Sequence, residues 1–509
     1  MMRISLFTIV AAGLALAAVH VSVQAADIAN LPLAADTAMG NNGPQPDLAL
    51  ADEVKAPHPP APVAPAPPAP APVEPALVAP APHPPAPVSP APVAPAPVAP
   101  APAATTPVEA AQPSEMAAPA LAPAEAAPAP DAMWHLPEPE VLKKLGIVQY
   151  GWIEQGATTN SLSPVNRWNG PVFCNDRSNE YEMNQLWLGW EKPVKQSDCG
   201  GFDIGGRVDL MYGSDWRYGD CYGLETNLDA PNRLYGFIMP QFYLEVGYNN
   251  LSVKMGHMAP SIGYEVVAAP GNFFYSHSYA LGYSEPVLVT GLQADYRIND
   301  HWNVLGGFNN GFNQFVDQNG MLHFLGGAKW HNDEHKVSLS WMIDAGPQDP
   351  LGQNHQYVSS LVFKKQFNEK LSYAFEQTVG GTEMIDNPDP AKFGPYAKWY
   401  GLDQYLLYTL NQCWSAGARA EVFRDQDGTR VGGLGSIGLT GWPAAGGFAG
   451  TFTEVTLGLN WHPNPNIVIR PEARWDCYSG STNVQGQEPF GDGTRTSQFL
   501  FATDLIFSF

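Results

Sequence analysis

Sixteen stretches of the chain alternate apolar and polar residues, and this period of two is typical of β-strands. In "KVSLSWMID", residues 336–344, one face holds Val337, Leu339 and Trp341, and the other holds lysine, serine and aspartate. The predicted strands lie at 147–155, 182–194, 202–212, 237–248, 251–259, 286–298, 302–310, 322–331, 335–345, 356–367, 370–380, 397–410, 413–424, 451–462, 466–478 and 497–509.

The segments between these strands alternate between short and long. The short ones follow even-numbered strands, at 249–250, 299–301, 332–334, 368–369, 411–412 and 463–465. Those after odd-numbered strands often have 10 to 26 residues. This asymmetry is typical of a transmembrane β-barrel, with short periplasmic turns and long extracellular loops. We therefore predict an all-β fold, an antiparallel transmembrane β-barrel of about 16 strands over 146–509.

The last predicted strand, "SQFLFATDLIFSF", ends the chain on the aromatic residue Phe509. Its face with Phe499, Phe501 and Phe507 is predicted to contact lipid, and the strand must pair with the first one to leave no backbone group unpaired. A terminal aromatic strand resembles the signal that the assembly machinery of bacterial outer-membrane barrels reads, so Phe509 is the predicted assembly signal. The tryptophans predicted for the interfacial girdles are Trp152, Trp187, Trp190, Trp341, Trp461 and Trp475.

The N-terminal part of the chain indicates export. Residues 1–25 have one positive charge, an apolar run and small residues before a predicted signal cleavage between Ala25 and Ala26. We expect 26–56 to be disordered and 131–145 to be a short segment before the barrel. Residues 57–130 hold 27 of the 50 prolines, so this Pro/Ala-rich linker is predicted to be extended polyproline II. It would act as a spacer or as a strut that reaches the cell wall.

The stretch "GYEVVAAPGNFFYSHSYA" at 263–280, followed by an alternating strand, resembles the putative beta-barrel porin-2 family of bacterial outer-membrane proteins. The resemblance would cover 146–509, and the Pro/Ala-rich segment lies outside it. It implies an outer-membrane pore, and it carries over no catalytic residue.

A long connection at 260–285 contains the candidate constriction residues. It would either fold inward and narrow the lumen or pack its aromatic side chains against the rim. The residues concerned are Tyr264, Glu265, Phe273, Phe274, Tyr275, His277 and Tyr279.

The charged faces of the strands are assigned to the lumen. The pore-lining candidates are Arg207, Asp209, Glu245, Lys254, Asp295, Arg297, Asp344, Glu376, Arg419, Glu421, Glu454, Arg470, Glu472, Arg474, Asp476 and Asp504, to which Asp203 adds one more acid. Acids outnumber bases on these faces by eleven to six. Because acidic rings favour cations, this count predicts a weak preference for cations.

The sequence gives little indication of nucleic-acid binding, catalysis or metal binding. The net charge of −15 over 146–509 argues against nucleic acid as a partner. No phosphate loop, metal-ligand spacing or dinucleotide fingerprint is present, so we predict neither an enzyme nor a cofactor or metal site. The neighbours Ser276, His277 and Ser278 do not by themselves make a triad, because triad roles are geometric. Of five cysteines, Cys174 and Cys221 lie in long loops on the same side and form a candidate disulfide.

Three functions remain open from the sequence. The first is a porin for passive diffusion of small hydrophilic solutes. The second is a structural barrel tethered to the cell wall by the Pro-rich segment, and the third is a secreted soluble β-rich surface protein. The partners expected for the first two are outer-membrane lipid, the assembly machinery, the cell wall and further copies of the chain in a homo-oligomer.

Overall fold

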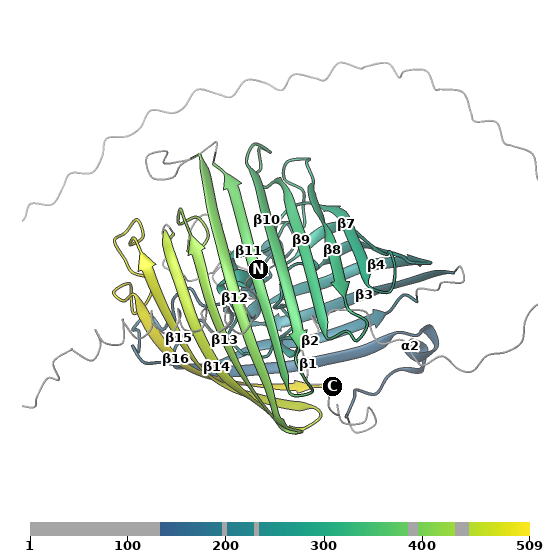
Figure 1. Ribbon diagram of the computed structural model, residues 1–509, viewed down its shortest axis with the longest axis horizontal. Coiled ribbons are helices and arrows are strands. Elements are labelled where there is room, and N and C mark those ends of the chain that lie inside the picture. Colours follow the sequence, from purple (N-terminus) through teal and green to yellow (C-terminus); the bar gives the residue numbers. More distant parts are fainter. Residues whose placement is uncertain (1–132, 196–200, 229–233, 385–394, 433–446) are drawn as a thin grey trace, which may run out of the picture. The chain divides into compact units, whose positions relative to one another are not determined.

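The computed structural model describes residues 133–509, apart from 196–200, 229–233, 385–394 and 433–446. The predicted signal cleavage site and the segments at 26–56 and 57–130 lie outside the described residues. Antiparallel strands form one closed barrel, in which each strand pairs with the next and β16 pairs with β1 (Figure 1). The strands are β1 (Val148–Asn160), β2 (Glu180–Lys192), β3 (Phe202–Gly213), β4 (Gly236–Tyr248), β5 (Leu251–Met258), β6 (Val289–Arg297), β7 (Trp302–Asn309), β8 (His323–His331), β9 (Val337–Pro347), β10 (His355–Gln366), β11 (Leu371–Glu383), β12 (Tyr396–Asn411), β13 (Trp414–Asp425), β14 (Gly450–Asn464), β15 (Ile467–Gly480) and β16 (Ser497–Ser508).

The predicted all-β barrel is confirmed, and each predicted strand corresponds to one strand of the structure. The largest difference is in β1, which continues to Asn160 instead of ending at 155. Residues 156–160 lack large apolar side chains, so their alternation is not visible in the sequence. They nevertheless pair with β16, from Gly156 opposite Asp504 to Asn160 opposite Leu500.

The strands form the wall of the barrel, and the helical segments of the described residues are short and are not part of this wall. They are α2 (Glu140–Leu145), η2 (Ser214–Tyr218), α3 (Glu225–Leu228), η3 (Ala269–Gly271) and η4 (Ala280–Ser284). In the described part of the chain, no helix has the length and apolar character needed to cross a membrane.

The two faces of the wall differ as the alternation predicts. In β16, Phe499 and Phe501 are 43% and 53% exposed, whereas Leu500 and Ala502, which alternate with them along the strand, are buried. This outward apolar face suits contact with lipid.

Two of the predicted girdle tryptophans are on the other face. Trp341 and Trp461 are exposed, but Trp152 and Trp187 are buried and stack on each other with ring centroids 4.5 Å apart. The indole nitrogen of Trp152 donates to the side chain of Gln185. The girdle prediction is wrong for this pair, because their positions on β1 and β2 face the inside of the barrel.

The barrel closes at the end of the chain. The backbone nitrogen of Phe509 donates to the carbonyl of Gly151, and the nitrogen of Gly151 donates to the carbonyl of Phe509, both over 2.9 Å. A Cβ at position 151 would lie 2.5 Å from the Phe509 ring. Trp134, in the segment before the barrel, packs against Phe507 and Phe509 with ring centroids 5.9 and 6.3 Å away. The last residue is therefore part of the seam, the pairing of β1 with β16 that closes the barrel.

Deleting Phe509 should impair assembly of the barrel and leave export intact. The deletion removes two backbone hydrogen bonds of the seam, worth about 1–3 kcal/mol together. The measurement is the yield of heat-modifiable protein in purified outer membrane. Phe501→Ala, on the same face of the same strand, shortens an outward side chain and leaves the backbone hydrogen bonds to β1 in place, so it is the control. An unchanged yield for the deletion would contradict the predicted role of Phe509.

Candidate functional site

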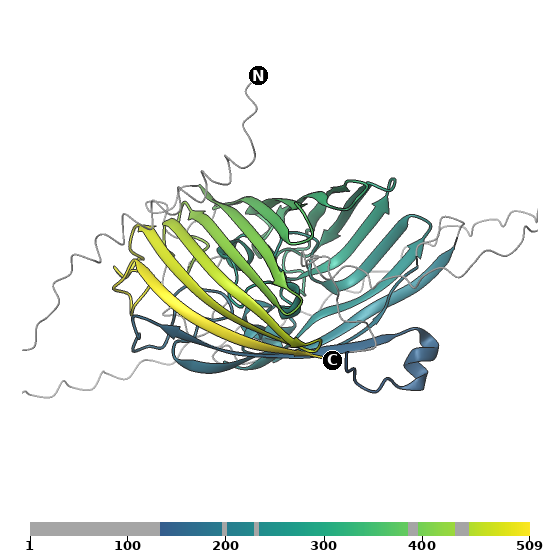
Figure 2. The ribbon, with the colours of Figure 1, turned by 60° about the horizontal axis from the view of Figure 1, so that its bottom comes forward.

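Residues 260–285, between β5 and β6, form what we call the inner loop. The inner loop does not extend the wall as strands. Its backbone and side chains instead contact inward-facing side chains of β2, β11, β13 and β15. Figure 2 shows teal coil of this part of the chain between the opposite walls of the barrel.

Arginines of the wall donate to backbone carbonyls of the inner loop. The pairs are Arg419 to Ser276 (2.6 Å), Arg474 to His277 (2.6 Å), and Arg470 to Asn272 (2.8 Å) and Ala269 (3.1 Å). A buried carbonyl without a partner would cost free energy comparable to a lost hydrogen bond. These arginines therefore stabilise a loop conformation that has no strand partner of its own.

Glutamates of the wall accept from backbone nitrogens of the same loop. Glu472 accepts from Tyr275 (2.9 Å) and Ser276 (3.1 Å), Glu421 accepts from Tyr279 (2.7 Å) and Ala280 (2.8 Å), and Glu376 accepts from Tyr264 (3.1 Å). Carboxylate acceptors make stronger hydrogen bonds to backbone nitrogens than neutral ones do. Three strands, β11, β13 and β15, thus bind the loop through the same kind of contact.

Glu265 of the inner loop is the centre of a buried charge cluster. Its carboxylate lies 2.8 Å from Arg419 and 3.1 Å from His277, and it accepts from the hydroxyl of Tyr405 over 2.9 Å. Burial alone would raise the pKa of Glu265, but the charge of Arg419 and the hydrogen bond from His277 hold that pKa well below its usual range. Glu265 is therefore ionised, and it binds the loop to β12 and β13.

Glycines on the wall leave room for the aromatic side chains of the inner loop. A Cβ at Gly156 would lie 2.7 Å from the ring of Tyr275, and one at Gly458 would lie 3.0 Å from Phe274. Gly417 has the same relation to Phe273. Glycine within a strand often marks such a close approach.

The structure places the predicted constriction residues inside the barrel. Phe274, Tyr275, His277, Tyr279 and Glu265 are buried, and Tyr264 and Phe273 are half-buried. The hydroxyl of Tyr275 donates to Asn184 of β2, and that of Tyr279 donates to Asp476 of β15. Of the two alternatives, the inward one agrees with these contacts.

Most of the predicted pore-lining charges are also buried. Only Lys254, Asp295 and Arg297 of the sixteen candidates are half-buried, and the other thirteen are buried. Many of the buried ones pair with each other, as Arg470 does with Asp504 over 2.6 Å. A charge that is buried against the inner loop or in an ion pair does not line open water.

Open space remains beside the inner loop, near β4–β10. A cavity of about 660 Å³ is bounded by residues from these strands and by the first residues of the loop. Its charged lining consists of Lys254, Lys329 and Lys364, with His331 and His335. A second cavity, of about 230 Å³, is lined by Tyr264, Phe273 and Arg470 among others.

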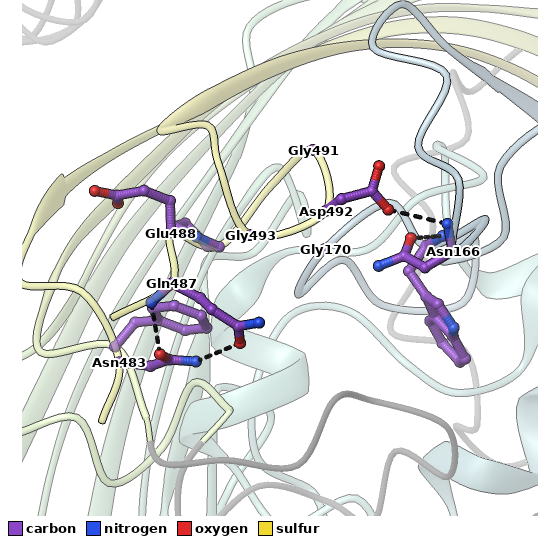
Figure 3. Close-up of a pocket in the computed structure, with 11 residues that line it drawn as sticks. Asn166, Gly170, Asn483, Gln487, Glu488, Gly491, Asp492 and Gly493 are labelled. Atoms are coloured by element: carbon purple, nitrogen blue, oxygen red, sulfur yellow. Dashed lines mark hydrogen bonds between the residues drawn. The ribbon is translucent and has the colours of Figure 1, made fainter. Parts of the chain in front are cut away.

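A smaller hollow lies where the loop after β1 meets the loop after β15 (Figure 3). Its volume is about 80 Å³, which is room for a few waters. Asp492 accepts from the backbone nitrogens of Val165 and Asn166 and so joins the two loops across the β1–β16 seam. Its neighbours Asn483 and Gln487 bond to each other. We interpret this hollow as part of the contact between the two loops.

The cysteines differ from the sequence prediction. Cys174 and Cys221 are both buried in one hydrophobic cluster, but both are free, so the predicted disulfide is not formed in the structure. The sulfur of Cys221 instead lies near Glu225 and His257. The sequence prediction missed this group, because His257 is on β5 and the other two residues are in the loop after β3. The spacing of Cys221 and Glu225, four residues apart, was the only local signal.

Comparison with known proteins identifies the family. Residues 147–509 match the model of the family described as "Putative beta-barrel porin-2, OmpL-like". No curated protein matches the chain in sequence.

Solved structures of outer-membrane proteins resemble the fold. The outer membrane channel DcaP of Acinetobacter baumannii is 9% identical, with 71% of this chain and 97% of that chain covered and a TM-score of 0.43. The anion-selective porin from Comamonas acidovorans is 10% identical, with 71% and 99% covered and a TM-score of 0.46. The outer-membrane expressed OmpT of Vibrio cholerae is 11% identical, with 71% and 97% covered and a TM-score of 0.43.

The family match covers the whole barrel, from the first strand to Phe509. Porins are typically channels without enzymatic activity. The chain belongs to the putative beta-barrel porin-2, OmpL-like family and is a porin-like β-barrel channel of the bacterial outer membrane.

Proposed function

We propose that the protein allows passive diffusion of small hydrophilic solutes through a lumen that the inner loop narrows. The observation that carries the proposal is the binding of the loop backbone by charged side chains of the wall, such as Arg419, Arg474 and Glu472. Solutes would pass beside the loop, along the half of the wall formed by β4–β10, where the larger cavity lies.

The ion preference is the second part of the proposal. The count of charges on the lumen faces favours cations, but most of the counted acids are buried against the inner loop or in ion pairs. The larger cavity has Lys254, Lys329 and Lys364 in its lining. A charged, low-dielectric wall raises the local concentration of counter-ions. We therefore favour a weak preference for anions over the weak preference for cations that the sequence predicts.

A structural barrel with little conduction is the second candidate function. The extent to which the inner loop fills the barrel favours it, since Tyr275, Tyr279 and Tyr283 are all fully buried. In this form of the proposal, the Pro/Ala-rich segment at 57–130 would reach the cell wall. Recognition of Phe509 by the assembly machinery and association of several copies are compatible with both candidates. Conductance in a planar bilayer distinguishes them.

Replacing Arg419 with glutamine should release the inner loop and increase single-channel conductance. Arg419 is buried and contacts Glu265, Glu454 and the carbonyl of Ser276, so its loss leaves buried carboxylates without a charged partner. Breaking such a buried pair costs about 3–5 kcal/mol, so the temperature at which heat-modifiable mobility is lost should also fall.

Arg424→Gln is the matched control. Arg424 is on the same strand, β13, and its side chain donates to Gln426 and Thr451, which are not part of the inner loop. We expect wild-type conductance for this variant. Unchanged conductance and unchanged stability in Arg419→Gln would contradict the proposed role of the loop.

Ion preference is tested by reversal potentials in a salt gradient. The wild-type barrel should prefer anions weakly, and the variant with Lys254, Lys329 and Lys364 all changed to glutamine should lose that preference. Because the Debye length is about 8 Å at 0.15 M salt, the effect should be larger at low salt. Lys370→Gln, at an exposed tight turn, is the control. A cation-preferring wild type would instead support the prediction from the charge count.

A further inference from the structure

Three buried side chains with metal-binding atoms meet at the end of the wall where the long loops lie. They are Cys221 and Glu225, from the loop between β3 and β4, and His257, near the end of β5. A cysteine sulfur, a carboxylate oxygen and a ring nitrogen all lie within 4.8 Å of one another. Each of these residues is fully buried, at 0% exposure. Among the described residues this is the one group of three such side chains.

The ring of His257 is held in place with one nitrogen left over. Its Nδ1 lies 2.7 Å from the hydroxyl of Thr290 on β6, and the ring packs edge-on against Phe315, with centroids 5.6 Å apart. Its Nε2 is buried and has no hydrogen-bond partner. In the tautomer in which Nδ1–H donates to the Thr290 hydroxyl, Nε2 has a free lone pair for a metal ion. Histidines that bind metals are oriented by such a bond from the second ring nitrogen.

The other two side chains are positioned by the backbone around them. The carboxylate of Glu225 accepts from the nitrogens of Met239, on β4, over 3.2 Å and of Cys221 over 3.3 Å. Cys221 is a free thiol, although an exported protein meets an oxidising environment. Neither a disulfide nor a role in the lumen accounts for a thiol, a carboxyl group and an imidazole with one unpaired nitrogen buried together.

We propose that Cys221, Glu225 and His257 bind one divalent transition-metal ion of the zinc class. Sulfur, imidazole nitrogen and carboxylate oxygen are the three kinds of protein ligand that zinc takes, usually in a tetrahedron, and a water would supply the fourth. Hard cations such as calcium and magnesium prefer sets made of oxygen atoms, so the thiol argues against them.

The bound ion would cross-link the loop after β3 to the wall at β5. That loop already bonds to the loop after β7, through the backbone of Tyr222 with Asn313 and Phe315. His257 comes three residues before the inner loop begins, so the ion would also fix the point where the inner loop leaves the wall. The inference does not depend on which solutes the barrel conducts.

The test uses the full-length protein, extracted from outer membrane in detergent and stripped with a chelator. Zinc is then added back and counted by elemental analysis, and cobalt is used as a spectroscopic substitute. We expect one ion per chain and a thiolate-to-cobalt charge-transfer band. Cys221→Ser should abolish the band, and His257→Gln should abolish stoichiometric binding. Thr290→Val, which removes the partner of Nδ1, should weaken binding by roughly 10–100-fold.

Two controls separate this site from adventitious binding. Cys413→Ser removes a thiol that is exposed, and His331→Ala breaks the stacked pair with His335, whose ring centroids are 4.0 Å apart. Both variants should keep the ion and the band. All variants are first checked for heat-modifiable mobility, so that loss of metal is not confused with loss of fold. A folded wild-type barrel that takes up no ion, or binding that persists in Cys221→Ser and His257→Gln, would overturn the proposal.

Discussion

Every backbone group that a membrane protein places in the bilayer must find its hydrogen-bond partner within the protein, and the rest of this structure depends on that constraint. The wall satisfies this constraint because the barrel is closed, and the backbone hydrogen bonds between Gly151 and Phe509 complete the pairing of β1 with β16. The inner loop runs inside the barrel without a strand ladder. Its carbonyls and nitrogens find partners in charged side chains of the wall instead, as Ser276 does with both Arg419 and Glu472.

This arrangement changes the role of the charged side chains inside the barrel. In an open pore, rows of acidic and basic side chains would act on passing ions. Here the glutamates of β11, β13 and β15 accept from the loop, and the arginines of β13 and β15 donate to it. The side of the barrel near β4–β10 keeps the larger cavity, with three lysines in its lining. We therefore propose that solutes pass on that side, whereas the contacts above bind the inner loop to the other side.

Much of the fold is predictable from the sequence, because lipid on one face and charge on the other impose a strict alternation on every strand. The alternation of short and long connections then predicts that each strand pairs with the next. The outward position of Phe501 follows from the alternation of residues along β16 alone. The alternation of residues could not show which of the two faces Trp152 and Trp187 occupy. It also could not show that residues such as Glu472 bind a loop about two hundred residues away in the chain. The Cys221 group likewise exists only once the loop after β3 is folded onto β5.

Accessibility of single cysteines to a charged methanethiosulfonate reagent, followed as block of the bilayer current, tests most directly whether the inner loop divides the lumen. In a Cys413→Ser background, Ser340→Cys would be in the lining of the larger cavity, and Thr378→Cys would be on a buried inward position of β11, a strand that contacts η4 of the inner loop. The account predicts rapid reaction and loss of current for Ser340→Cys, and protection of Thr378→Cys. Equal reaction at both positions would mean that the loop does not occupy that half of the barrel, and would contradict the account.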